Sequence, residues 1–349
     1  NPQRSKSATS TGNTRSEWLA DRRKRVRSNK ASYPPAQSST DVEEKNHHIM
    51  KQRFSTIGIP LIFVLGVLLS GCYGFDPIKD KQNKLKEELN NGGSETSPTP
   101  PEGQSVFDVR FSFEKWSDTT PALPLGEGGF SSSFWASASN EGFKAMPNPT
   151  LPYPVTFADE GYQGRCVRML TRPGIKVYGM GSYLVAASLF SGKVDVSKLI
   201  SAPLEATYFG HRVRQRPIRL RGYYRYKAGS KYIDGSIGPD AVLEGKDQCT
   251  IAGVFYEVTE DTPYLNGKNL YTAPSIVSIA KVIANDTDGW QPFDLTFRSV
   301  GNKVVDLANK QYRLALVFSS SSRGDEYIGS VDSELLVDEV TLTLTTLPE

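Results

Sequence analysis

Residues 218–227 read IRLRGYYRYK, with apolar and polar side chains in alternation. Successive side chains of a β-strand point to opposite faces, so this alternation predicts a strand with one buried and one exposed face. The face predicted to point inward carries Ile218, Leu220, Gly222, Tyr224 and Tyr226. The other face carries Arg219, Arg221, Tyr223, Arg225 and Lys227. This row of cations is either a solvated sheet face or a surface for hydroxyl-rich or acidic ligands.

The same period of two recurs along much of the chain after residue 105. The further predicted strands are 106–113, 250–258, 276–283, 293–300, 312–318 and 335–344. These segments are rich in β-branched and aromatic residues, Gly, Pro, Asn and Asp separate them, and no long helical period is present. The pattern predicts that 105–349 is one all-β domain, an antiparallel β-sandwich.

Residues 50–71 have the parts of a secretory signal peptide. A basic start at Met50–Arg53 precedes an apolar run at 57–69, which is shorter than the ~20 residues of a comfortable membrane span. The segment Leu69–Cys72 resembles the bacterial lipobox, and this implies that Cys72 is diacylated and becomes the mature N-terminus. The alternative is a membrane-anchoring helix that keeps its signal, with Cys72 as a bystander.

The segments on either side of the signal have no apolar period. Residues 1–49 are polar and basic, and we interpret them as a disordered or spurious upstream extension. Their alternative role is a cytoplasmic nucleic-acid-binding arm. Residues 72–104 are rich in Gly, Ser and Pro and predict a flexible tether. The predicted location is therefore the cell envelope. The lipid anchor is expected in the outer membrane, and the domain is on either the periplasmic or the outer side of that membrane.

The composition limits the chemistry of the mature chain. Twelve of the 41 Lys and Arg and five of the 38 Asp and Glu lie in residues 1–71, which leaves 29 against 33, a formal charge of −4. This balance gives no case for nucleic acid as a partner, and membrane contact is expected through the lipid alone. His211 is the only remaining histidine, so a multi-His zinc site is excluded. Cys166 and Cys249 form either one disulfide or two buried thiols.

Three spaced motifs carry a family resemblance. They are FSFEKW at 111–116, FGH with RPIRLRGYYRYK at 209–227, and FSSSSRGD with SELLVDEV at 318–340; ASLFSGK at 187–193 fits between them. In these motifs the chain resembles the putative carbohydrate metabolism domain (PCMD) family, found in lipoproteins of Gram-negative gut and oral bacteria. The resemblance implies a jelly-roll β-sandwich similar to carbohydrate-binding modules, and a role in glycan handling or glycoside hydrolysis. Members often carry another β-domain before this one, where this chain has the tether.

Several side chains are suited to sugar hydroxyls or sugar ring faces. The candidate carbohydrate-binding residues are Trp135, Arg216, Tyr223, Arg225, Arg323 and Asp325. Trp135 follows a Gly- and Ser-rich stretch, so we predict a loop ring open to a ligand, whereas Trp290 is expected in the core. Arg323 and Asp325 share a serine-rich loop that either binds hydroxyls or is an exposed hairpin.

Carboxylates suggest two further kinds of site. Glycoside hydrolysis needs two carboxyl groups roughly 5–10 Å apart. The candidates, none in a diagnostic motif, are Glu114, Asp325, Glu326, Asp332 and Glu334. Asp338 shares its strand parity with Val340 and is therefore predicted to point toward the core. Jelly-roll sugar modules often hold a structural calcium between first and last strands, so Glu114 and Asp338 are candidate calcium ligands. The alternative is an aspartate bonded to backbone.

These observations favour an accessory lipoprotein that binds glycans or helps to process them, with binding preferred over catalysis. The enzyme alternative is a glycoside hydrolase using two of these carboxylates. The third reading is an adhesin or fimbrial assembly protein, in which strands mediate protein contacts.

Overall fold

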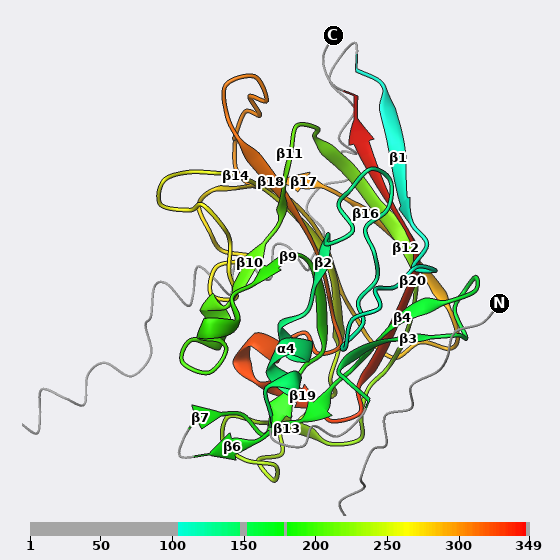
Figure 1. Ribbon diagram of the computed structural model, residues 1–349, viewed down its shortest axis with the longest axis vertical. Helices are drawn as coiled ribbons and strands as arrows, with labels where there is room; N and C mark the ends of the chain where they lie inside the picture. Colours follow the sequence, from blue (N-terminus) through cyan, green and yellow to red (C-terminus); the bar gives the residue numbers. More distant parts are fainter. Residues whose placement is uncertain (1–103, 147–151, 178–179, 347–349) are drawn as a thin grey trace, which may run out of the picture. The chain divides into compact units, whose positions relative to one another are not determined.

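The computed structural model describes residues 104–146, 152–177 and 180–346. The predicted extension 1–49, the signal 50–71, Cys72 and the tether up to residue 103 lie outside the described residues. In the described part, no helix combines the length and the apolar composition needed to cross a bilayer. Two antiparallel sheets form the body of the domain (Figure 1).

The first sheet has six strands with the motif at 218–227 near its centre. Its order is β16 (Gln291–Thr296), β12 (Pro217–Lys227), β20 (Glu334–Thr345), β4 (Cys166–Leu170) and β3 (Val155–Ala158), with β1 (Val106–Phe111) paired to β20. Every pairing is antiparallel, and β1 and β4 pair with opposite halves of β20. The first and last predicted strands are therefore neighbours in this sheet.

The second sheet has eight strands. Its order is β10 (Thr207–Phe209), β9 (Ser188–Val194), β18 (Tyr312–Ser319), β14 (Cys249–Glu257), β15 (Ile276–Ala284) and β17 (Arg298–Ser299). In addition, β11 (His211–Val213) pairs with β18, and β2 (Trp135–Ala136) pairs with β9.

Short elements fill the connections. The two-stranded ladders are β13 (Tyr232–Asp234) with β19 (Ile328–Ser330), β5 (Arg172–Pro173) with β8 (Leu184–Val185), and β6 (Lys176–Val177) with β7 (Met180–Gly181). The helical pieces are α4 (Ala138–Lys144), η1 (Val196–Lys198), η2 (Pro203–Glu205) and η3 (Gly324–Glu326). The hydroxyl of Ser137 accepts the Asn140 N–H at 3.2 Å and so starts α4.

The main core lies between the two sheets. Leu220 of β12 and Val337 of β20 belong to the same buried cluster as Phe255 of β14 and Leu316 of β18. Burial of apolar surface in this layer is the main force that holds the sheets together. The predicted all-β antiparallel jelly-roll sandwich is confirmed.

The outer face of the eight-stranded sheet has its own apolar cover. Val254 and Val317 pack there against Leu265 and Leu270 from the long connection between β14 and β15. Residues of this connection therefore bury part of that face.

Both described cysteines are buried free thiols. Of the two alternatives for Cys166 and Cys249, the unpaired one is therefore confirmed. Burial raises the pKa of each thiol to about 12, so both stay protonated at neutral pH.

A β-bulge in β20 changes the predicted direction of Asp338. Arg221 pairs with Thr341, but Tyr223 pairs with Asp338, so β20 has one extra residue in this interval. Glu339 occupies the bulge with a φ of 52°. The extra residue reverses the alternation, so Val340 points into the core whereas Asp338 lies on the outer face with Tyr223. The predicted core direction of Asp338 was wrong because sequence parity cannot include a bulge.

Candidate functional site

The structure separates the predicted sugar-binding residues. Trp135 lies in β2, is only 4% exposed, and packs against Phe111 and Phe318 in the main core. The prediction of an open loop ring was therefore wrong. Its ring contributes to an aromatic core cluster, and the preceding Ser-rich segment ends at a strand that pairs with β9.

Arg216 and Arg323 lie away from Tyr223. Arg216 donates its backbone N–H to the Thr345 hydroxyl at 3.1 Å, and seven strand positions, about 23 Å, separate it from Tyr223. Arg323 follows β18 of the other sheet and forms an ion pair with Glu326 at 2.6 Å. Asp325 belongs to η3, in the same loop. These residues do not form one site.

Tyr223 and Arg225 do belong to a common surface, which we call the Tyr162 patch. It consists of Tyr162, Tyr223, Arg225 and Trp290 on the outer face of the six-stranded sheet. The Tyr162 ring is stacked on Tyr223 with centroids 3.6 Å apart, and Arg225 lies over Trp290 at 5.7 Å. Tyr162 is 48% exposed and covers one face of Tyr223, so Tyr162 presents the open ring. Trp290 was expected in the core, but it is half-buried here because β16 begins only after it.

Glu114 and Asp338 hold the same loop. Asp338 Oδ2 accepts the Gln163 N–H at 2.9 Å, and Glu114 Oε1 accepts the Arg165 N–H at 3.0 Å. Asp338 Oδ1 accepts the Glu339 N–H at 2.8 Å, so both of its oxygens bind backbone. This arrangement matches the backbone-bonded alternative. The described residues contain no group of three or more His, Cys, Asp or Glu side chains suited to a metal. Calcium at this place stays a prediction.

The environment of Asp338 changes its protonation. Burial raises the pKa of its carboxyl to about 6, and the nearby charges of Glu339 and Glu114 contribute in the same direction. The hydrogen bonds from the N–H groups of Gln163 and Glu339 act against this shift. Asp338 is completely buried, so its raised pKa does not make it an acid within reach of a substrate.

Two of the other candidate carboxylates form ion pairs with nearby arginines. Glu334 pairs with Arg168 at 2.6 Å, and Glu326 pairs with Arg323. Asp332 has a φ of 67° in the turn that precedes β20. Asp247, which the sequence did not single out, is buried and accepts hydrogen bonds from the hydroxyls of Ser321 and Ser333. These contacts are typical of carboxylates that stabilise turns and strands.

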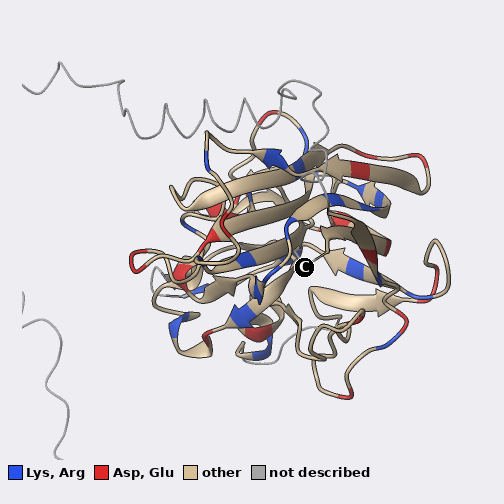
Figure 2. Cartoon of the chain, turned by 90° about the horizontal axis from the view of Figure 1, so that it is seen from above, with Lys and Arg blue, Asp and Glu red and all other residues tan. Residues whose placement is uncertain are grey.

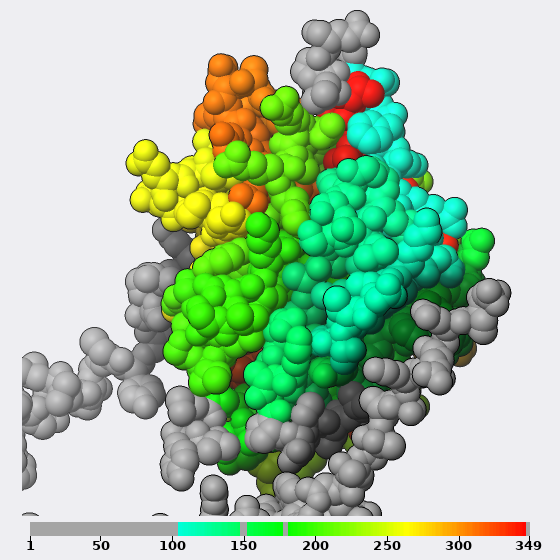
Figure 3. Space-filling view, in the orientation of Figure 1, coloured from blue at the N-terminus to red at the C-terminus, as the bar shows by residue number. Residues whose placement is uncertain are grey.

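An open pocket of about 400 Å³ lies at the β9–β11 part of the eight-stranded sheet. It is lined by Gly129, Phe130, Ser131, Phe134, Lys193, Gly210, His211, Arg212, Tyr264 and Arg313. The lining combines aromatic rings, the hydroxyls of Ser131 and Tyr264, and several cations, and it contains no Asp or Glu. Figure 3 shows the segments that carry most of these residues, teal and green, next to each other on one face.

Local backbone geometry places each wall of the pocket. Gly128 and Gly129 both have positive φ values, 62° and 88°, in the turn that leads to Phe130. Glu127 fixes this turn by accepting hydrogen bonds from Ser112. On the other wall, Gly210 has a φ of 88°, which lets the chain leave β9 after β10 and pair with β18 as β11.

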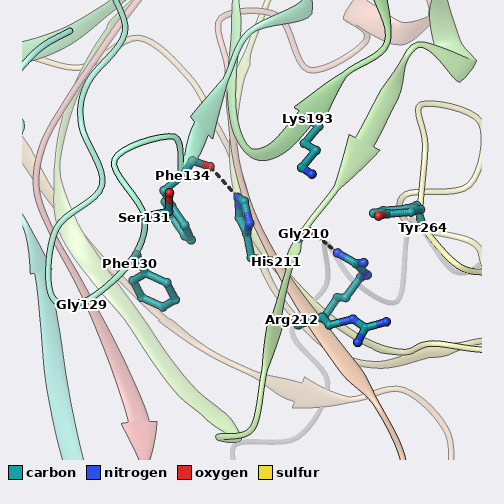
Figure 4. A pocket seen from close by; sticks show the side chains of 10 residues that line it. Gly129, Phe130, Ser131, Phe134, Lys193, Gly210, His211, Arg212 and Tyr264 are labelled. Atoms are coloured by element: carbon teal, nitrogen blue, oxygen red, sulfur yellow. Dashed lines mark hydrogen bonds between the residues drawn. The ribbon is translucent and has the colours of Figure 1, made fainter.

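His211 is the histidine that the sequence left without a role. Its Nε2 lies 2.8 Å from the Phe134 carbonyl oxygen, to which the ring donates (Figure 4). Its ring also stacks on Phe134, with centroids 4.8 Å apart. Burial lowers the pKa of His211, and the nearby Arg313 and Lys193 add to the shift. His211 is therefore neutral at neutral pH and connects the two walls.

Arg313 and Tyr264 form the far side of the pocket. The guanidinium of Arg313 lies 4.0 Å from the Tyr264 ring centroid and donates to the Gly210 carbonyl at 2.9 Å. In Figure 4 the Lys193 ammonium lies between His211 and Tyr264. The sequence did not predict that these residues form a pocket, although His211 and Lys193 lie inside the motifs that carry the resemblance.

Comparisons with known proteins agree with this architecture. A family model described as "Putative carbohydrate metabolism domain" matches residues 108–343. A solved putative glycoside hydrolase from Bacteroides thetaiotaomicron is 33% identical over 66% of this chain and 70% of that chain, with a TM-score of 0.59. Another from Bacteroides vulgatus is 30% identical over 66% of this chain and 96% of that chain, with a TM-score of 0.57. A search of curated proteins gives no match.

Proposed function

Because the chain belongs to the putative carbohydrate metabolism domain family, we propose that it is an exported lipoprotein that binds glycans without cleaving them. The binding site is the pocket between the 129–134 segment and β11. The lipid anchor at Cys72 and the outer-membrane location are parts of the same proposal, and they rest on the sequence of residues 50–72.

The composition of the pocket lining carries the proposal. Tyr264 and Phe130 supply ring surface, Ser131 supplies a hydroxyl, and the lining holds no Asp or Glu. Sugars have apolar C–H faces and hydroxyl rims, so rings and polar donors together suit them. The volume is within the range typical of small-ligand sites.

Glycoside hydrolysis is the second candidate, because the two solved Bacteroides proteins described above are named as putative glycoside hydrolases. The reaction needs a pair of carboxyl groups across the scissile bond. The pocket lining has none, and Asp338, whose pKa is raised, lies buried beneath the 161–165 loop. Binding is therefore the function that the geometry supports better.

The adhesin or assembly alternative receives less support from the sheet edges. The described strands of the two sheets that pair on one side only are all short: β1 and β16 have six residues each, β3 has four, β10 and β11 have three, and β2 and β17 have two. Strand addition to a partner requires a long unpaired edge. Among the described strands the longest, β12 and β20, are central.

A glycan array with the detergent-solubilised full chain, run beside a reducing-end assay on the same glycans, tests this proposal. We expect retention of a subset of glycans and no increase in reducing ends. Release of sugars from any retained glycan would show that the protein hydrolyses glycans and would contradict the proposal of binding without cleavage. A lack of retention on the whole array would remove the glycan-binding proposal.

A further inference from the structure

The pocket contains an uncompensated group of positive charges. Arg212 of β11 pairs directly with Arg313 of β18 in the antiparallel ladder. Like charges at directly opposed positions destabilise a sheet. Lys193 of β9 lines the same pocket, so three cations from three neighbouring strands share one opening.

Several other arginines on the sheets have carboxylate partners. Arg219 pairs with Asp294, Arg221 with Asp108 at 2.8 Å, and Arg168 with Glu334 at 2.6 Å. Both signs of charge are spread over the described chain in Figure 2. By contrast, Lys193, Arg212 and Arg313 form no ion pair with any residue that the structure describes.

Arg313 gives the strongest sign of a missing partner. It is 9% exposed, and its Nε has no hydrogen-bond partner among the described residues. One of its other nitrogens already donates to Gly210, and its plane lies on Tyr264, so the guanidinium is held in place. A buried charge without a counter-ion is costly, and an anionic ligand in the pocket would compensate it.

We infer that the pocket binds the anionic substituent of an acidic glycan, either the carboxylate of a uronate or a sulfate ester. Arg212, Arg313 and Lys193 bind the anion, while Tyr264 and Phe130 contact the sugar ring. This inference rests on the proposed glycan binding and gives the ligand class for the same site. A guanidinium fork donates two parallel hydrogen bonds to either kind of anion.

Isothermal titration of the full chain with three oligosaccharide probes tests the inference. The first is oligogalacturonate, the second is its methyl ester, which has lost the charge, and the third is chondroitin sulfate, which adds sulfate to uronate. We expect at least one acidic probe to bind roughly tenfold more tightly than the methyl ester, with an affinity that falls as salt rises. Unsulfated chondroitin, which keeps the uronate and lacks the sulfate, then shows which of the two anions the site prefers.

Matched variants connect that preference to the pocket. Arg212→Gln should lose roughly tenfold in affinity for the acidic probe, whereas Arg298→Gln, an exposed arginine on β17, should change it less than about twofold. The binding of the acidic probe should also raise the pKa of His211, measured by NMR with His211→Gln for assignment, because an anion favours the imidazolium. Inorganic sulfate at equal ionic strength controls for an adventitious anion effect.

The outcomes separate the two levels of the proposal. If the methyl ester binds as tightly as both acidic probes, the charge inference is overturned and glycan binding stands. The same conclusion follows if Arg212→Gln has no effect, or if inorganic sulfate alone shifts His211 as strongly as the probe. If none of the three probes binds and the glycan array is also silent, both the inference and the proposed function fail.

Discussion

At the scale of single residues, Asp338 is the described carboxyl with the clearest consequence for stability. Its folded pKa is about 6, whereas an aspartate in an unfolded chain has a pKa of about 3.9. Between these values the folded state binds more protons than the unfolded state. The free energy of unfolding therefore falls as pH rises through this window, by on the order of 2 kcal/mol from this group.

We predict that Asp338→Asn removes this loss. The amide keeps an oxygen acceptor for the loop and carries no charge to bury. The free energy of unfolding, measured with urea at about pH 4 and about pH 7.5, tests this. The difference between variant and wild type should shift in favour of the variant by on the order of 2 kcal/mol from the lower to the higher pH. Asp261→Asn, an exposed carboxylate, is the control. An equal difference between variant and wild type at both pH values would contradict the raised pKa.

The calcium prediction at Glu114 and Asp338 has a separate test. A bound cation would favour the ionised carboxylate and stabilise the folded state. Millimolar calcium should then raise the midpoint of thermal unfolding by several degrees relative to EGTA, and Glu114→Gln should abolish the rise. The same midpoint in calcium and in EGTA would leave both residues with their observed role of holding the 161–165 loop.

At the scale of elements, the bulge in β20 decides which side chains reach the core. Glu339 is in the left-handed region and pairs with Arg110. Deleting Glu339 restores plain alternation, so either Asp338 enters the core or Val340, Leu342 and Leu344 leave it. We predict that the deletion costs more than ~4 kcal/mol and prevents folding, because exposing each aliphatic side chain costs about 1.5–3 kcal/mol.

Glu339→Gly is the matched variant. Glycine adopts this φ without strain, which offsets the loss of the Arg110 ion pair, so unfolding free energy should stay within about 1 kcal/mol. Chemical denaturation of the two variants measures the difference. A deletion variant as stable as Glu339→Gly would mean that the bulge does not set the register.

The same element shows how far the sequence can predict the fold. Period-two alternation located β12, β14, β15, β18 and β20, because each has a buried and a more exposed face or a continuous apolar run. It gave the inward face of β12 correctly. It failed at Asp338, since one inserted residue reverses parity without any sign in the pattern. It failed at Trp135 because a two-residue strand has no period.

At the scale of the whole molecule, the pocket depends on long-range topology. Its walls come from the 129–134 segment, β9, β11, the β14–β15 connection and β18. Arg212 and Arg313 are neighbours only because β11 pairs with β18. No local spacing contains that information, so the sequence could suggest a carbohydrate ligand through the family resemblance but could not identify the residues of the pocket. The resemblance itself was confirmed by the family match.

The proposed membrane attachment also concerns the whole chain. We predict that Cys72→Ala moves the protein from the membrane to the soluble fraction, because the acyl chains are the proposed attachment. Fractionation and labelled palmitate, with the buried Cys166→Ala as the cysteine control, measure this. Unchanged fractionation of Cys72→Ala, or no palmitate in the wild type, would remove the lipid anchor and leave the pocket chemistry as it stands.

The most direct test of the account compares two ring deletions against one glycan selected from the array. Tyr264→Ala removes one of the rings that line the pocket, and Tyr162→Ala removes the exposed ring of the Tyr162 patch on the other sheet. With folding checked by thermal unfolding, calorimetry should show that Tyr264→Ala weakens binding roughly tenfold or more and that Tyr162→Ala leaves it within about twofold. Loss of binding in Tyr162→Ala together with wild-type affinity in Tyr264→Ala would contradict the assignment of the site to the pocket.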